Sequence, residues 1–185
     1  MKRFLMICAA VAFVPALISC AGGKAKKADA TKILVAYYSA TGTTAKVAAD
    51  LASVTGGDLY EIRPVTPYSD EDLDWRNQNS RSSVEMKNPS WREPIVEDLQ
   101  GADTYDVVYI GFPIWWNTAP TVINSFIEKY GFEGKTVILF GTSGGSTLDN
   151  AVKVFREAYP DINWKSGKTL NNLTTDELKA WVGSL

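Results

Sequence analysis

Residues 39–44 read Ser-Ala-Thr-Gly-Thr-Thr and bring four hydroxyl groups into one short stretch. Hydroxyl and backbone N–H groups together can hold an anion such as a phosphate. The stretch has no lysine and a single glycine, so it matches neither the G-x-x-x-x-G-K-[ST] loop nor the G-x-G-x-x-G loop. Taken alone, it is compatible with two interpretations: an ordinary helix cap, or a seat for an anion.

The flanking residues predict a strand that leads directly into a helix. Residues 33–38, Ile-Leu-Val-Ala-Tyr-Tyr, are typical of a strand buried on both faces of a parallel sheet. Residues 45–52 are rich in alanine and contain Val47 and Leu51, which favours a helix with a small apolar face. The first N–H groups of such a helix are free and its dipole is positive there, so this junction favours an anion.

Two further loops occupy the same kind of position. A buried strand predicted over 107–112 is followed by residues 113–120, Pro-Ile-Trp-Trp-Asn-Thr-Ala-Pro, and a strand over 136–140 is followed by residues 141–146, Gly-Thr-Ser-Gly-Gly-Ser. Both loops lead into amphipathic helices. In an open parallel sheet the carboxyl ends of the strands lie at one edge, where ligands bind. The three loops together indicate a ligand with a phosphate and a flat ring.

The order of the elements predicts an α/β fold. Strands are also expected over 58–62 and, more weakly, over 162–170, and the chain closes with a helix that begins in a Thr174–Glu177 capping box. Alternating strands and helices form a mostly parallel sheet through right-handed crossovers. Residues 63–94 fit no element, and their length and aromatic content predict a packed insertion after the second strand.

The composition excludes several classes of chemistry. The 185-residue chain has no histidine, and its two cysteines are Cys8 and Cys20. Residues 31–185 therefore contain no disulfide, no thiolate nucleophile and no Cys/His metal site, and no side chain is predicted to be catalytic. Without Lys2 and Arg3 the net charge is −4, which does not suggest nucleic-acid binding. Difficult chemistry would then require an organic cofactor.

The N-terminus predicts export. Lys2 and Arg3 precede an apolar run over 4–18 that is short for a membrane-spanning helix. Leu-Ile-Ser-Cys at 17–20 resembles the lipobox of bacterial lipoproteins, which implies cleavage before Cys20 and lipidation of that residue. The predicted organisation is a signal peptide over 1–19, a flexible tether over 20–30 and a folded domain over 31–185, anchored to a membrane of the bacterial cell envelope. An uncleaved anchor is the alternative.

Over nearly all of 31–185 the sequence resembles the flavodoxin family, in a branch common among bacterial lipoproteins. The resemblance implies a doubly wound, five-stranded parallel sheet of order 2-1-3-4-5, with helices on both faces, that binds FMN. The phosphate motif [ST]-x-T-G-x-T corresponds to Ser39, Ala40, Thr41, Gly42, Thr43 and Thr44, which would hold the phosphate without a cation. The second loop, on the flavin ring, corresponds to Pro113, Ile114, Trp115, Trp116 and Asn117. The third loop corresponds to Thr142, Ser143, Gly144, Gly145 and Ser146.

Two departures from the family bear on function. Many flavodoxins have a glycine where Asn117 stands, and many cover the second flavin face with an aromatic residue that the third loop lacks here. One face of the ring is therefore expected to be open unless Tyr68 or Trp75 of the insertion covers it. This favours an oxidoreductase that reacts with a nicotinamide or a quinone. The alternatives are a one-electron carrier for a redox protein partner and a binding domain that has lost its flavin.

Overall fold

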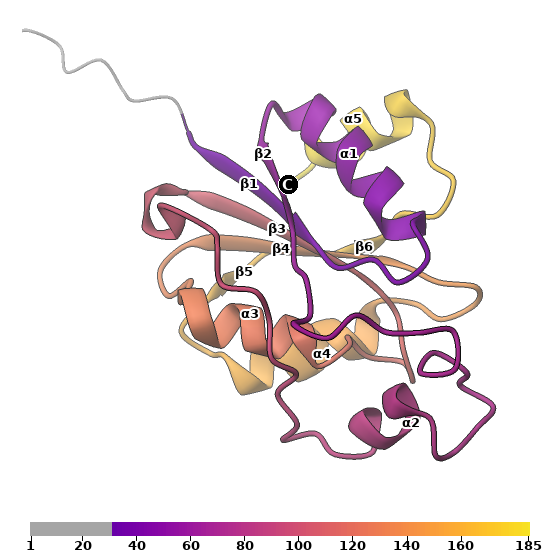
Figure 1. Ribbon diagram of the computed structural model, residues 1–185. Coiled ribbons are helices and arrows are strands. Elements are labelled where there is room, and N and C mark those ends of the chain that lie inside the picture. The colour runs from indigo at the N-terminus through magenta and orange to yellow at the C-terminus, as the bar shows by residue number, and fades with distance from the viewer. Residues whose placement is uncertain (1–30) are drawn as a thin grey trace, which may run out of the picture.

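The structure is a computed structural model that describes residues 31–185; the predicted signal peptide, Cys20 and the tether over 20–30 lie outside the described residues. Its centre is a parallel sheet in the order β2-β1-β3-β4-β5, which confirms the predicted order (Figure 1). The strands have the following bounds: β1 Ile33–Tyr37, β2 Asp58–Glu61, β3 Val107–Pro113, β4 Thr136–Thr142, β5 Asn163–Trp164 and β6 Lys168–Thr169.

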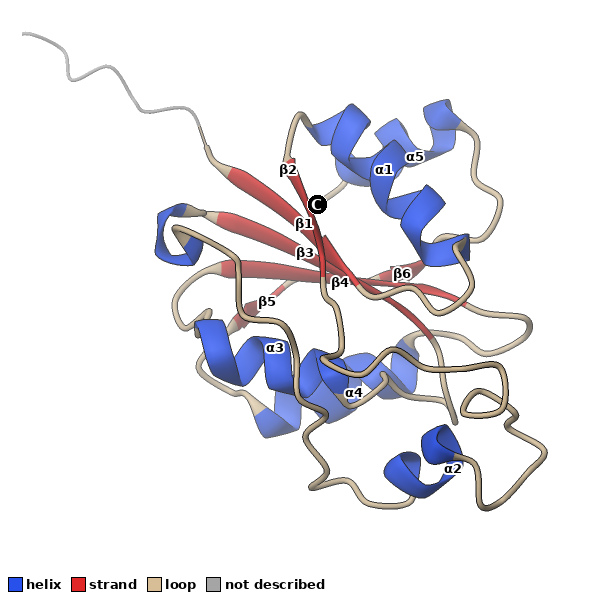
Figure 2. Cartoon of the chain, in the orientation of Figure 1, coloured by secondary structure: helices blue, strands red, loops and turns tan. Residues whose placement is uncertain are grey.

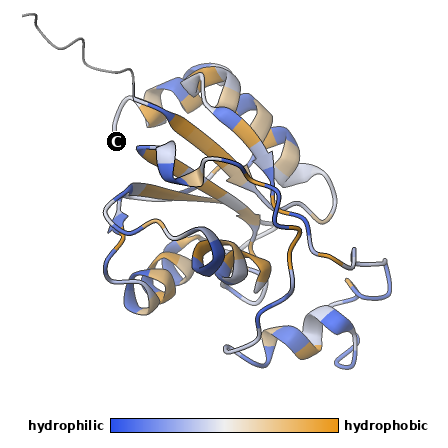
Figure 3. Ribbon diagram, turned by 60° about the vertical axis from the view of Figure 1, so that its left-hand side comes forward, coloured by the Kyte–Doolittle hydropathy of each residue, from blue (hydrophilic) through white to orange (hydrophobic). Residues whose placement is uncertain are grey.

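Helices cover both faces of this sheet (Figure 2). Helices α1 (Thr43–Thr55) and α5 (Thr175–Val182) pack on one face, and α3 (Val122–Tyr130) and α4 (Asp149–Ala158) pack on the other. Successive strand residues enter the two cores in turn, because side chains alternate across a sheet. The central strands β1, β3 and β4 accordingly contribute residues to both cores, and Figure 3 shows these central strands largely in the hydrophobic colour.

The last strand is split. Residues of β5 pair with the start of β4, at Thr136 and Val137, whereas those of β6 pair with Phe140 and Gly141. Between them the backbone of Gly167 approaches β4 so closely that a Cβ atom would lie 2.6 Å from the carbonyl oxygen of Leu139. The weak strand predicted over 162–170 is thus two short ladders, joined by residues 165–167.

The insertion is a folded excursion from the end of β2. An antiparallel bridge between Pro64 and Ile95 closes its base, and it contains one short helix, α2 (Arg81–Met86). A 3₁₀ turn, η1 (Ala102–Thr104), then leads into β3. Within residues 31–185 no helix is long and apolar enough to cross a membrane.

Candidate functional site

The first loop joins β1 to α1 and ends in a helix terminus that no side chain caps. Gly42 occupies the N-cap position with φ 86°, a left-handed conformation that glycine adopts without strain, and its N–H donates to Ser39 Oγ at 3.1 Å. The predicted cap of α5, by contrast, is present in full, with Thr174 and Glu177 bonded reciprocally. The start of α1 therefore presents free N–H groups to its surroundings.

The second loop is a tight hairpin that follows β3. Trp115 and Thr118 exchange two backbone hydrogen bonds of 2.9 and 2.8 Å, so Trp116 and Asn117 form a two-residue turn. Both turn residues have positive φ, 44° and 64° respectively. Asparagine tolerates this conformation readily, whereas a tryptophan there is strained. Trp115 packs against Tyr38, just before the first loop, with 5.8 Å between the ring centroids, whereas Trp116 is 46% exposed.

The third loop follows β4 and bends around its own serine. Ser143 Oγ accepts hydrogen bonds from the N–H groups of Gly145, at 3.1 Å, and Ser146, at 2.8 Å. A Cβ atom added to Gly144 or Gly145 would meet nothing within 4 Å, so this loop is open on its outer side. The loop carries no aromatic residue, as the sequence indicated.

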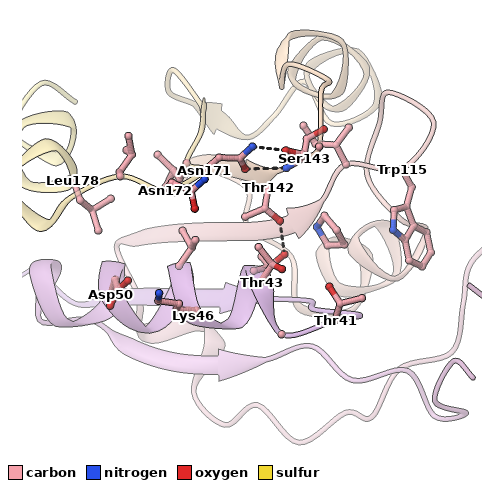
Figure 4. Close-up of a pocket in the computed structure, with 18 residues that line it drawn as sticks. Thr41, Thr43, Lys46, Asp50, Trp115, Thr142, Ser143, Asn171, Asn172 and Leu178 are labelled. Carbon is pink, nitrogen blue, oxygen red and sulfur yellow. Dashed lines mark hydrogen bonds between the residues drawn. The ribbon is translucent and has the colours of Figure 1, made fainter. Parts of the chain in front are cut away.

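A fourth segment, which no sequence motif predicted, holds the third loop in place. Asn171, just after β6, accepts a hydrogen bond from Ser143 N–H through Oδ1 at 3.0 Å, and its Nδ2 donates to the Ser143 carbonyl. The amide side chain of Asn171 thus binds both the backbone N–H and the backbone carbonyl of Ser143. Figure 4 shows these two bonds above the cavity. Asn171 also follows the carboxyl end of a strand, which is where ligands bind in an open parallel sheet. The same reasoning that predicted the other loops therefore applies to this segment.

The four segments enclose one cavity of about 820 Å³ at the carboxyl edge of the sheet (Figure 4). Ten of the predicted site residues line it: Thr41, Gly42, Thr43, Thr44, Pro113, Ile114, Trp115, Thr142, Ser143 and Gly144. Eight lining residues were not predicted: Lys46, Val47, Asp50, Leu170, Asn171, Asn172, Leu173 and Leu178.

Six of the residues predicted for the three loops do not line this cavity. Ser39 and Ala40 lie beside a second, smaller cavity of about 430 Å³, which is also bordered by Tyr38 and Tyr68. The other four, Trp116, Asn117, Gly145 and Ser146, line neither cavity. Gly145 and Asn117 hold their loops in place through backbone atoms. The N–H of Gly145 donates to Ser143 Oγ, and the carbonyl oxygen of Asn117 accepts a hydrogen bond of 3.0 Å from Asn150 on α4.

The cavity contains one cation and one carboxylate from α1. Thr43, Lys46, Val47 and Asp50 are spaced three and four residues apart and thus share one face of the helix. Within the described part of the chain neither Lys46 nor Asp50 has an ion-pair partner. The resemblance to the flavodoxin family implies a phosphate held without a cation, whereas the structure places Lys46 in the same cavity.

A doubly wound parallel sheet whose loops enclose a cavity at the carboxyl edge of the strands defines a class of ligand-binding α/β proteins. Within that class this chain belongs to the flavodoxin family, because residues 32–185 match the family model described as flavodoxin. No curated protein matches the chain.

Solved structures agree with this assignment. A protein from Bacteroides eggerthii that is described as a flavoprotein is 52% identical, with a TM-score of 0.81 over 83% of this chain and 97% of that chain. A protein from Bacteroides uniformis with the same description is 49% identical, with a TM-score of 0.80 over 83% of this chain and 98% of that chain. A flavoprotein from Lactobacillus acidophilus, solved in complex with FMN, is 24% identical, with a TM-score of 0.65 over 83% of this chain and 99% of that chain. This third likeness concerns the fold alone.

Proposed function

We propose that this protein binds FMN in the cavity at the carboxyl edge of its sheet and acts as a redox protein. The observation that carries the proposal is the uncapped start of α1, which shares one cavity with the threonine hydroxyl groups of the first loop and the indole of Trp115. The two Bacteroides proteins, about half identical to this chain and described as flavoproteins, support a flavin as the ligand.

The residues present fit FMN at both ends. The free N–H groups of α1, the hydroxyl groups of Thr41 and Thr43, and Lys46 suit a phosphate dianion. Pro113, Ile114 and Trp115 supply the apolar and aromatic surface that a flat ring requires. The volume of about 820 Å³ lies within the range of about 300–1,000 Å³ for small-molecule sites. When bound, the flavin supplies the electron-transfer chemistry, and the chain binds, orients and shields it.

We propose that the reaction partner is a small molecule, either a nicotinamide or a quinone. The third loop supports this proposal, because Gly144 and Gly145 leave its outer side open and no aromatic residue of that loop covers it. Trp75 is 68% exposed and lines neither cavity, so the insertion does not supply that cover through this residue. One observation favours a protein partner instead: Trp116, beside the cavity, is 46% exposed, and aromatic residues are enriched in protein interfaces.

Ligand titrations test the flavin proposal. FMN, riboflavin and FAD are each titrated with purified protein, and the quenching of flavin fluorescence gives the affinity. We expect the affinity for FMN to be higher than that for riboflavin. Anaerobic mixing of the FMN-loaded protein with NADH or NADPH, followed by a quinone, then distinguishes an enzyme from a carrier. Absence of FMN binding would overturn the proposal, and bleaching only by a reduced protein partner would favour the carrier.

We propose further that the protein is anchored to a membrane outside the cytoplasm through Cys20. The support is the sequence of residues 1–20 alone, whose charged start, apolar run and Leu-Ile-Ser-Cys end resemble a lipoprotein signal. Replacing Cys20 with serine is expected to move the protein into the soluble fraction after cell lysis. The matched control is Cys8→Ser, which alters the apolar run only and leaves the protein in the membrane. Membrane retention of the Cys20 variant would favour an uncleaved anchor.

A further inference from the structure

Three aromatic rings form a closed group behind the cavity. Trp115 meets the edges of two tyrosines almost at right angles: Tyr38 with a ring-centroid distance of 5.8 Å and Tyr68 with one of 5.5 Å. The two tyrosine rings lie 6.1 Å apart. Tyr38 directly follows β1 and is 3% exposed, whereas Tyr68 comes from the insertion. Trp115 therefore has a ring from the sheet and a ring from the insertion against it.

A buried charge cluster fixes Tyr68. Its hydroxyl donates a hydrogen bond to Glu85 Oε2, and the guanidinium carbon of Arg81 lies 4.0 Å from the centroid of its ring. Arg81 in turn donates to Glu85 Oε1 at 2.8 Å and forms a close ion pair with Glu93. Glu85 and Glu93 are 2% and 5% exposed.

The same arginine connects the two ends of the insertion. Arg81 Nη1 donates to the carbonyl of Thr66 at 2.9 Å, and Trp91 Nε1 donates to Glu93 at 3.2 Å. Burying charges costs free energy, and apolar side chains of similar volume often stabilise a fold at least as well. Two buried carboxylates around one guanidinium, with the Asp72 carboxylate a third at 4.0 Å, are therefore poorly explained by stability alone. The cluster does, however, give Tyr68 a single position and orientation.

We infer that Tyr68 is a positioning residue for Trp115, and that the insertion, through its Arg81–Glu85–Glu93 cluster, forms part of the cofactor site. This inference rests on the proposed function, because Trp115 is the residue that the flavin ring would contact. It assigns a role to residues 63–94, which the three family loops do not include. The cluster also places more negative than positive charge behind Trp115, which disfavours added electrons on a nearby flavin.

The test uses two variants of Tyr68 and one matched control. Replacing Tyr68 with alanine removes the ring and is expected to weaken FMN binding by about two- to tenfold, the range for one aromatic pair. Replacing it with phenylalanine keeps the ring and should restore most of that affinity. Tyr105→Phe is the control, since the Tyr105 hydroxyl also bonds a carboxylate, Asp58 at 2.9 Å, but lines neither cavity. It should leave FMN affinity unchanged.

Two readouts separate positioning from general stability. In a double-mutant cycle, the effects of Tyr68→Ala and Trp115→Phe on FMN affinity should be smaller together than their sum, because both act through the same contact. Glu85→Gln should raise the midpoint potential of the bound flavin, since it removes a negative charge, while Glu97→Gln at an exposed position should not. Additive effects in the cycle, with an unchanged potential for Glu85→Gln, would overturn the inference.

Protein without flavin keeps this test independent of the proposed function. The near-ultraviolet circular dichroism of the tyrosine–tryptophan group should be lost alike in Trp115→Phe and Tyr68→Ala. If the wild-type protein binds no FMN but shows this shared loss, the proposed function fails and the positioning of Trp115 by Tyr68 stands. If FMN binds normally and Tyr68→Ala changes neither its affinity nor the spectrum, the inference fails and the proposed function stands.

Discussion

The hydroxyl of Thr44, in the first turn of α1, lies 2.8 Å from that of Thr142, at the end of β4, although 98 positions separate the two residues. Both are buried, with exposures of 1% and 4%. This hydrogen bond joins the first and third loops directly beneath the cavity. The relative position of the two loops is therefore fixed by the fold before any ligand binds.

Replacing both of these threonines should destabilise the protein by less than the sum of the two single replacements. Thr44→Val or Thr142→Val leaves the other hydroxyl buried without its partner, at a cost of about 1–3 kcal/mol in the free energy of unfolding. The double variant should cost less than the sum of the two, because no unpaired hydroxyl remains. Urea unfolding of the four proteins measures this coupling, and simple additivity would show that the bond does not link the loops.

The first loop should distinguish FMN from riboflavin. Thr41→Ala and Thr43→Ala together are expected to weaken FMN far more than riboflavin, since each removed hydrogen bond to a charged group is worth about 1.5–3 kcal/mol. The matched control is Thr55→Ala at the other end of α1, whose hydroxyl bonds the Leu51 carbonyl at 2.8 Å. Equal losses for the two ligands would contradict a phosphate at this loop.

Lys46 should add a salt-sensitive contribution to FMN binding. Its charge lies in the cavity beside the first loop, and a close pair of unit charges in water gains about 1 kcal/mol. Lys46→Met should weaken FMN by about fivefold at low salt and make the affinity less dependent on salt, because exposed charges are screened. Lys153→Met, on the outer side of α4, is the control. An unchanged salt dependence would exclude Lys46 from the phosphate site.

The fold could be predicted because its main strands are unusually clear in the sequence. Residues 33–37, 107–112 and 137–140 are apolar runs, and each is followed by a loop and a helix. In a parallel sheet this pattern is enough to predict that the three loops lie at one edge of the sheet. The last strand was less clear, because its two short ladders depend on the close approach of Gly167 to Leu139.

The parts that escaped prediction depend on contacts between distant residues. Lys46 comes after the hydroxyl stretch and belongs to no recognisable sequence motif. It reaches the cavity because it lies on the same face of helix α1 as Thr43. Asn171 was missed because its partner, Ser143, is 28 positions away. The positive φ of Trp116 reflects the hairpin rather than any preference of tryptophan. The insertion shows no hydrophobic periodicity in the sequence, because contacts between the side chains of Arg81, Glu85 and Tyr68 hold it together instead of a regular helix or strand face.

The carboxyl group of Glu85 should give the stability of the fold a pH dependence of definite sign. Burial raises the pKa of Glu85, the charge of Glu93 acts in the same direction, and hydrogen bonds from Tyr68 and Arg81 oppose both. A group with a higher pKa in the folded state contributes stability below its unfolded pKa, about 4.3 for glutamate, and loses it as the pH rises through the folded value.

The comparison of wild type with Glu85→Gln isolates this contribution. As the pH rises above about 4.3, the unfolding free energy of the wild type should fall relative to that of the variant, because only the wild type must ionise a buried carboxyl. Urea unfolding at several pH values measures the difference, with the exposed Glu97→Gln as control. If the unfolding free energy of the wild type instead rises with pH relative to that of the variant, the partners of Glu85 favour its ionised form.

The outer side of the third loop should control access to the flavin. A Cβ atom at Gly144 meets nothing within 4 Å, and this glycine does not have positive φ, so a tyrosine fits there without backbone strain. We expect Gly144→Tyr to slow the reaction with NADH or a small quinone by tenfold or more, while FMN affinity changes by less than about threefold, because the ring covers the open side without touching the phosphate loop. Stopped-flow absorbance gives the rate and fluorescence titration gives the affinity, with Lys153→Tyr as a surface control. An unchanged rate would mean that electrons leave through the exposed edge near Trp116, which would favour a carrier with a protein partner.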